Sequence, residues 1–223
     1  MSTKANREPF FVKDCALVTI ATGQKAQNLK EMREHLHNIH LGSIYHHFWG
    51  GLLRPRFDEP EYNNDFAEWV HHALQDNILA ERLSVIDPDP FVNLESLRQE
   101  LLEAIDQRLD EIGTLTWANP DMQFHFVRAQ MVVFDTSGKI EEPEELVEAV
   151  PKMSVGSIFY HFIDARRRSP EMMDDFRTWL RYCGDGDLCS QLAVVDPYFG
   201  SLVELRKQLT DLFTKYFFQE VTG

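Results

Sequence analysis

Residues 42–69 read GSIYHHFWGGLLRPRFDEPEYNNDFAEW, and residues 156–179 read GSIFYHFIDARRRSPEMMDDFRTW. With one four-residue gap after Arg54, 11 of the 24 aligned positions are identical. Average composition would give about one or two matches. The stretch is therefore an internal duplication, and the rest of the chain is interpreted around it.

The segments that precede the two copies have the composition of β-strands. Residues 10–21 are rich in Phe, Val, Thr and Ile and end at Thr22-Gly23, while 124–134 end at Ser137-Gly138, so each predicts a strand closed by a turn. In this alignment 11–13 match 126–128. A buried helix remains an alternative for 10–21. Because single strands are unstable, the two segments must pair with something, and each is a candidate partner for the other.

Most of the remaining sequence shows the 3.6-residue period of amphipathic helices. Helices are predicted over 28–39, 66–74, 78–83 and 94–112, and over 144–150, 176–183, 188–192 and 202–216. Two more begin after Gly42 and Gly156, with Ser43 and Ser157 as expected N-caps. A capping box is expected at 65–68. Trp69 and Trp179 lie in apolar stripes and are expected in the core.

The predicted fold class is mainly α with a few short β-strands, at the margin of α+β. We expect two tandem repeats of about 100 residues, related by an approximate twofold axis and packed as one globular unit. The first repeat spans 10–112, a linker spans 113–122, and the second repeat spans 123–219.

Composition and charge narrow the classes of partner. Hydrophobic residues make up 43% of the chain, charged residues 26%, and the net charge is −14. A surface this negative disfavours nucleic acid and anionic membranes. No apolar run is long enough for a signal peptide or a membrane span. The three cysteines, Cys15, Cys183 and Cys189, form no CxxC motif. Together these features predict a cytoplasmic protein.

The motif order resembles a bacterial and archaeal family known as domain of unknown function 5752, from about residue 10 to about 219. The motifs are an aromatic segment, T-G, N-L, S-I-x-x-H, D-F-x-x-W, D-P and a closing L-R helix. They lie at Thr22-Gly23, Asn28-Leu29, Ser43-Ile44, His47, Asp65-Phe66, Trp69, Asp87 and Leu97-Arg98, and in the second copy at Ser157-Ile158, His161, Asp175-Phe176, Trp179, Asp196-Pro197 and Leu205-Arg206. The resemblance implies no catalytic residue.

Polar residues shared by the copies are the candidate binding residues. Each copy has a His, an Arg seven residues later, and an Asp at the start of the next helix. Together they can form an anion pocket, since arginine binds carboxylate or phosphate with two parallel hydrogen bonds. The alternative is structural: the aspartate caps its helix or pairs with the arginine, and the histidine bonds to backbone. The candidates are His47, Arg54, Asp65, His161, Arg166, Arg168 and Asp175.

Seven of the nine histidines lie in the first copy, which raises a metal site as a weaker hypothesis. The weak candidates are His37, His40, His46, His71 and His72. There is no HExxH, P-loop or GxGxxG motif, so no cofactor is predicted. The leading interpretation is a non-catalytic binding or regulatory protein for a small anion or a protein partner. The alternative is a hydrolase, either metal-dependent or using His47 and Asp65 for acid–base chemistry.

Overall fold

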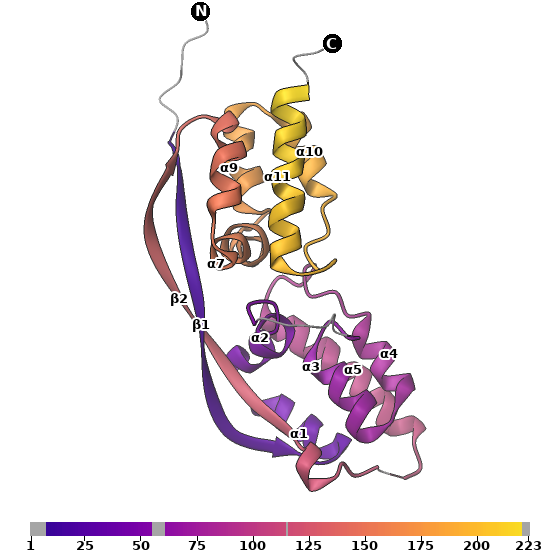
Figure 1. The fold of residues 1–223 in the computed structure, drawn as a ribbon. Helices are drawn as coiled ribbons and strands as arrows, with labels where there is room; N and C mark the ends of the chain where they lie inside the picture. Colours follow the sequence, from indigo (N-terminus) through magenta and orange to yellow (C-terminus); the bar gives the residue numbers. More distant parts are fainter. Residues whose placement is uncertain (1–7, 55–60, 115, 220–223) are drawn as a thin grey trace, which may run out of the picture. The chain divides into compact units, whose positions relative to one another are not determined.

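The computed structural model describes residues 8–54, 61–114 and 116–219. Two strands, β1 (Phe10–Ala26) and β2 (Phe124–Ile140), form one two-stranded antiparallel sheet, and the other regular elements are helical (Figure 1). The mainly α class is confirmed, and so is the strand at 10–21, which excludes a buried helix there. The strands are not short, however, because each has 17 residues.

Both predicted Thr/Ser–Gly turns lie inside strands, so the prediction of strand ends there is wrong. Gly23 has a left-handed φ of 76°, but the hydroxyl of Thr22 donates a 2.5 Å hydrogen bond to the carbonyl of Phe126 across the sheet. The hydroxyl of Thr136 bonds to the carbonyl of Val12 in the same way. These side-chain bonds let the ladder continue past a local irregularity.

The chain folds into two compact units, and the division falls inside both strands. Unit A comprises Leu17–Met131, and unit B comprises the described residues up to Ala16 and from Val132 onward. In unit A the helices are α1 (Leu29–Asn38), α2 (Leu41–Trp49), α3 (Asp65–Trp69), the π-helix η1 (Val70–Leu74), α4 (Asn77–Ser84), α5 (Leu94–Glu111) and η2 (Pro120–Met122).

The core of unit A forms where α5 packs on α1, α2 and α4. Its fully buried residues include Met32, Phe66 and Leu97. Arg98, next to Leu97, is also buried, and its guanidinium donates to the carbonyls of His37 and Ile39 at the end of α1. These bonds satisfy carbonyls that a helix C-terminus leaves without partners.

Unit B repeats this plan. Its elements are η3 (Pro143–Glu145), α6 (Leu146–Ala149), η4 (Val150–Lys152), α7 (Val155–Ile158), the π-helix η5 (Phe159–Asp164), α8 (Ala165–Arg168), α9 (Asp175–Cys183), α10 (Gly186–Ala193) and α11 (Leu202–Gln219). α11 packs on α6, α7 and η4. Phe159, Phe162, Phe176 and Phe213 are fully buried. Arg206 donates to the carbonyl of Met153, as Arg98 does to α1.

Unit A contains the last part of β1 and the first part of β2, whereas unit B contains the first part of β1 and the last part of β2. In unit A, Phe124 of β2 stacks on Phe66 at 5.2 Å, and the indole N–H of Trp69 donates to the carbonyl of Met122 at 2.7 Å. In unit B, Phe10 of β1 stacks on Phe176 at 5.1 Å. Both tryptophans are buried, as predicted. The helices of each copy are thus completed by the strand of the other.

The structure corrects the sequence alignment of the two strands by one residue. The burial patterns of β1 and β2 agree when Phe10 is matched with Phe124, and Lys13 and Val127 then make equivalent bonds. Matching 11–13 with 126–128 is therefore wrong. A slip of one residue exchanges the two faces of a strand, so only this register buries the same face in both copies.

The glycines of the GSI motifs allow a close approach between helix and strand. A Cβ on Gly42 would lie 2.8 Å from the carbonyl oxygen of Ala129 in β2, and one on Gly156 would overlap the carbonyl of Cys15 in β1. The predicted N-caps are wrong, because Ser43 and Ser157 lie inside their helices. The caps are His40 for α2 and Ser154 for α7.

The predicted capping box at 65–68 is also wrong. Asn64 caps α3 by accepting from the N–H of Ala67, and Asp174 caps α9 by accepting from the N–H of Arg177. Asp65 and Asp175 occupy the first helical position instead. Their carboxylates are therefore available for other partners.

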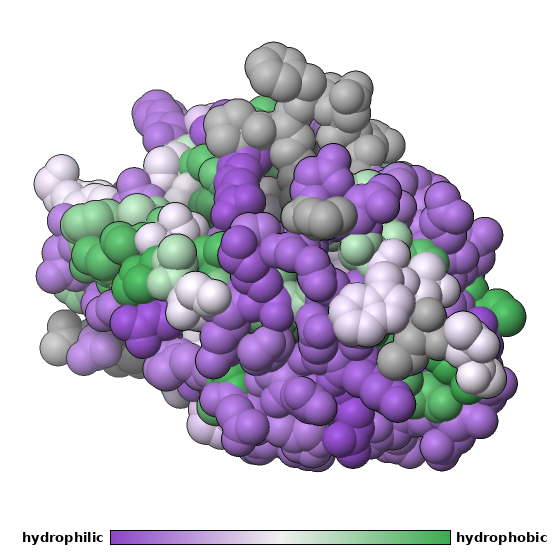
Figure 2. All heavy atoms as spheres, turned by 90° about the horizontal axis from the view of Figure 1, so that it is seen from below, coloured by the Kyte–Doolittle hydropathy of each residue, from purple (hydrophilic) through white to green (hydrophobic). Residues whose placement is uncertain are grey.

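The protein surface seen in Figure 2 is mostly hydrophilic, and hydrophobic side chains occupy only separated parts of that face. In the described ranges, no helix has both the length and the apolar character required to cross a membrane.

Candidate functional site

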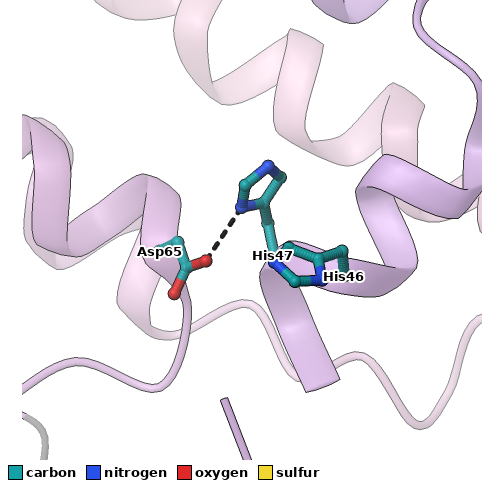
Figure 3. Close-up of side chains that lie close together, drawn as sticks. All are labelled: His46, His47 and Asp65. Atoms are coloured by element: carbon teal, nitrogen blue, oxygen red, sulfur yellow. Dashed lines mark hydrogen bonds and ion pairs between the residues drawn. The ribbon is translucent and has the colours of Figure 1, made fainter. Parts of the chain in front are cut away.

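The duplicated histidine of unit A has a partner at each ring nitrogen. Nδ1 of His47 lies 2.8 Å from Oδ2 of Asp65, as drawn in Figure 3, and Nε2 lies 3.2 Å from the backbone N of Val127 in β2. Because a backbone N–H can only donate, Nε2 must be the acceptor and Nδ1 must carry the hydrogen. The ring is thus held as one neutral tautomer between a helix, the start of the next helix and a strand.

His161 of unit B makes the same three-way connection. Nδ1 lies 2.8 Å from Oδ2 of Asp175, and Nε2 accepts from the N–H of Lys13 at 2.8 Å. Both histidines are almost fully buried. Both histidines thus bond to backbone, but the group is an N–H and not the carbonyl expected in the structural alternative.

The arginine of the first copy does not reach the predicted triad. α2 ends at Trp49, so Arg54 is not on the helix face of His47, and its guanidinium donates instead to Nε2 of His46 at 2.9 Å. Burial, His47 and the Arg54 charge lower the pKa of His46 to about 4. His46 is consequently neutral at physiological pH and accepts this bond.

In the second copy the structure does assemble His, Arg and Asp. The guanidinium of Arg168 donates to Oδ2 of Asp164 at 2.9 Å, to Oδ2 of Asp175 at 3.1 Å and to the carbonyl of Tyr160 at 2.9 Å. It also lies 3.9 Å from the centroid of the Tyr160 ring, within cation–π distance. Burial opposes the charge, but Asp175 outweighs it and raises the pKa of Arg168. Arg166 lies elsewhere, over the ring of Phe162.

A cavity of about 600 Å³ in unit B contains this triad. Its lining residues are Glu8, Pro9, Phe10, Phe11, Lys13, Tyr160, His161, Arg168, Asp175, Thr178, Trp179, Tyr182 and Cys183. Sequence reasoning missed Phe11 and Tyr182. Both are large aromatic residues outside the buried stripes of their elements, 58% and 80% exposed, and that position is the signal that would have identified them.

A second cavity, of about 530 Å³, lies in unit A away from every candidate residue. Its arginine, Arg108, donates to Asp76 at 2.8 Å and to Glu111 at 3.0 Å. Because none of the candidate binding residues lines this cavity, we assign it no role.

Of the five weak metal candidates, two join no cluster of three ligands among the described residues and three do. His37 is exposed on α1, and Nδ1 of His40 accepts from the N–H of Gly42 at 2.9 Å, so neither joins a cluster of three ligands within the described residues. His46 lies with His47 and Asp65, while His71 and His72 lie with Glu61. The glutamate was not predicted from the sequence, although it is identical in both copies.

Two of the three cysteines, Cys15 and Cys189, lack the environment of a reactive thiol. Cys15 is buried and donates to the carbonyl of Gly156, and burial together with Asp164 and Asp14 raises its pKa to about 12. Burial also raises the pKa of Cys189. Because a reactive cysteine requires a stabilised thiolate, these residues are structural.

Comparison with known proteins identifies the family. The model described as "Family of unknown function (DUF5752)" matches residues 7–214, and the chain belongs to that family. The chain is similar to the solved structure of OrfY from Thermoproteus tenax, at 28% sequence identity and a TM-score of 0.79, covering 93% of this chain and 95% of that one. No curated protein matches the sequence.

Proposed function

We propose that the protein is a non-catalytic binding protein that takes a small anion with an apolar portion into the cavity of unit B. The observation that carries the proposal is the presence of Arg168, Asp175 and His161 in a cavity of about 600 Å³ with aromatic walls. This volume lies in the range of small-molecule sites, which combine apolar walls with a few convergent polar groups.

Two donor groups are available to an anionic ligand, although Asp164 and Asp175 already balance the charge of Arg168. The Nε and Nη2 atoms of Arg168 bond to Asp164, Asp175 and Tyr160, which leaves the two hydrogens of Nη1 without a partner among the described residues. Among the described residues, the amine of Lys13 has a single ion pair, at 3.6 Å with the exposed Asp135. A carboxylate or phosphate can accept from both groups, and charge-assisted bonds of this kind are the strong ones.

The walls favour a ligand with a flat apolar part. Phe11, Trp179 and Tyr182 line the cavity together with Phe10. Aromatic side chains contribute offset or edge contacts to another ring beyond the area that they bury. No comparable feature of the described residues favours a protein partner, the other class expected from the sequence.

The acid–base form of the hydrolase alternative, which uses His47 and Asp65, is not favoured by the geometry. A general base needs a nitrogen lone pair that can reach a substrate. The lone pair on Nε2 of His47 accepts from Val127, and that of His161 accepts from Lys13. Both imidazoles would have to break a strand contact before they could take a proton.

We further propose that residues 10–112 and 123–219 are tandem repeats joined by the linker 113–122. The proposal is supported by matched contacts inside the two units, such as Arg98 and Arg206 at helix ends and the histidine–aspartate pairs. The exchange of strand segments would follow if two copies that once paired as separate chains had been fused.

Calorimetric titration tests the binding proposal. The panel is inorganic phosphate, phenyl phosphate, benzoate and a neutral aromatic amide. Phenyl phosphate or benzoate is expected to bind more tightly than phosphate or the amide. Tyr182→Ala and Lys13→Gln should weaken binding by about tenfold each without loss of stability. Val194→Ala, 84% exposed and outside the cavity, is the control. Absence of binding across the panel, or binding that neither variant alters, overturns the proposal.

A further inference from the structure

Unit A holds a second cluster that the binding proposal does not use. Nε2 of His71 lies 3.9 Å from Oε1 of Glu61, and Nε2 of His72 lies 3.9 Å from Oε2 of the same carboxylate. The side chains of all three residues are accessible, with exposed fractions of 28%, 52% and 60% for His71, His72 and Glu61. Three ligand atoms of the kinds that hold metals therefore face one another at the protein surface.

His71 and His72 are consecutive residues of the π-helical turn Val70–Leu74, and their ring centroids lie 4.8 Å apart. Consecutive rings lie about as close on an α-helix, since those of His46 and His47 in α2 are 5.0 Å apart. π-helical turns are rare and often occur at functional sites.

The matched residues of unit B show what this carboxylate holds there. Glu171 corresponds to Glu61 and forms an ion pair with the guanidinium of Arg181, which occupies the position of His71. In unit A the distances of 3.9 Å are too long for hydrogen bonds. In unit B the glutamate is therefore paired with a protein cation, Arg181, whereas in unit A it faces two imidazole rings.

We infer that Glu61, His71 and His72 bind a divalent transition-metal ion. Two imidazole nitrogens and one carboxylate oxygen suit Zn²⁺, Ni²⁺ or Cu²⁺, whereas Mg²⁺ and Ca²⁺ require oxygen ligands. Metal–ligand distances of about 2.0–2.2 Å draw the three side chains together, and an ion with three protein ligands keeps a coordination position for water. Nδ1 of His71 has no hydrogen-bond partner among the described residues. No protein contact therefore fixes the tautomer of this ring, so Nδ1 can carry the hydrogen while the lone pair of Nε2 binds the metal ion.

The other histidine cluster of unit A is not equivalent. Both nitrogens of His47 are bonded, and Nε2 of His46 accepts from Arg54. Nδ1 of His46 has no hydrogen-bond partner among the described residues, but a metal ion bound to His47 would displace Asp65 or break the contact with β2. The cluster at Glu61 requires neither change.

Calorimetric titration of full-length protein without a histidine tag tests the inference, with ZnCl₂, NiCl₂ and MgCl₂ as probes. One zinc or nickel ion is expected per chain, with no magnesium binding. Glu61→Gln and His72→Ala should weaken the affinity at least about tenfold, while His37→Ala, on an exposed histidine outside the cluster, should not. Zinc should raise the melting temperature of the wild type but not that of His72→Ala.

His71→Arg is the matched variant, because it introduces the residue that unit B uses. It should bind no zinc while keeping the melting temperature of the metal-free wild type, since a guanidinium replaces the ion. The inference is overturned if no zinc binding is detected up to about 1 mM. A Kd of that size corresponds to a binding free energy of only about −4 kcal/mol. The inference is also overturned if zinc binding survives Glu61→Gln and His72→Ala, or is lost in His46→Ala instead.

Discussion

The backbone N–H of Lys13 donates a 2.8 Å hydrogen bond to Nε2 of His161, a residue 148 positions further along the chain. Val127 and His47 form the equivalent bond in unit A. Each imidazole also bonds an aspartate, so a single side chain connects the strand of one copy to two helices of the other. The same connection is thus made by the histidine of each copy.

Removal of this histidine should loosen the strand as well as lower stability. His161→Ala leaves the Lys13 N–H and the Asp175 carboxylate without the imidazole that they share, and we expect a loss of about 2–4 kcal/mol in the free energy of unfolding. Amide hydrogen exchange gives the specific measurement, because protection at Lys13 should fall in the variant. His37→Ala should change neither value. Unaltered protection at Lys13 would show that the imidazole does not hold the strand.

Gly42 and Gly156, which lie five residues before these histidines, should be sensitive to a single added carbon atom. Gly42→Ala places a Cβ 2.8 Å from the carbonyl oxygen of Ala129, so either the strand or the helix must shift. We expect a loss of about 1–3 kcal/mol, measured by urea unfolding. Gly186→Ala is the control, because nothing lies within 4 Å of its added Cβ. Equal stability of the two variants would contradict the close-approach argument.

His46 should make unit A sensitive to acid. Its folded pKa of about 4 lies below the ordinary value of 6.5, so the unfolded chain binds more protons between these values. The contribution is fully present above pH 6.5 and is lost as the pH falls towards 4, with a magnitude on the order of 3 kcal/mol. His46→Tyr introduces the residue found at this position in unit B, Tyr160. Its stability should fall less than that of the wild type between pH 7 and 5, and an equal fall would exclude this role of His46.

The sequence predicted what depends on local pattern. The 3.6-residue period located the helices, and the aromatic composition located the strands. It failed where a distant segment decides the role of a residue. Local sequence marks Gly42 as a helix terminator and Asp65 as a cap. Their actual roles depend on contacts that the local sequence does not show, because β2 lies against Gly42 and His47 bonds to the carboxylate of Asp65.

The same distinction holds for the candidate sites. Only the fold shows that Arg54 bonds to His46 while Arg168 bonds to Asp175, because this depends on where the helices after His47 and His161 end. One signal was nevertheless present in the sequence. Aligning the copies beyond their identities would have shown that the positions of Arg181 and Tyr182 hold His71 and His72.

Arg168 should resist replacement even by lysine. Its planar fork bonds to Asp164, Asp175 and the carbonyl of Tyr160 at once, which a single ammonium group cannot do. The side chain of Asp164 is only 2% exposed, and its other ion pair, with Arg167, is longer at 3.5 Å, so a weakened Arg168 contact leaves this buried carboxylate less well compensated. We expect Arg168→Lys to cost about 2–3 kcal/mol at pH 7. Arg181→Lys is the matched control: its ion pair with Glu171 is solvent-exposed, and such pairs contribute about 0–1 kcal/mol. Urea unfolding at pH 7 measures both effects. Similar losses for the two variants would show that the planar fork of Arg168 is not required to compensate Asp164.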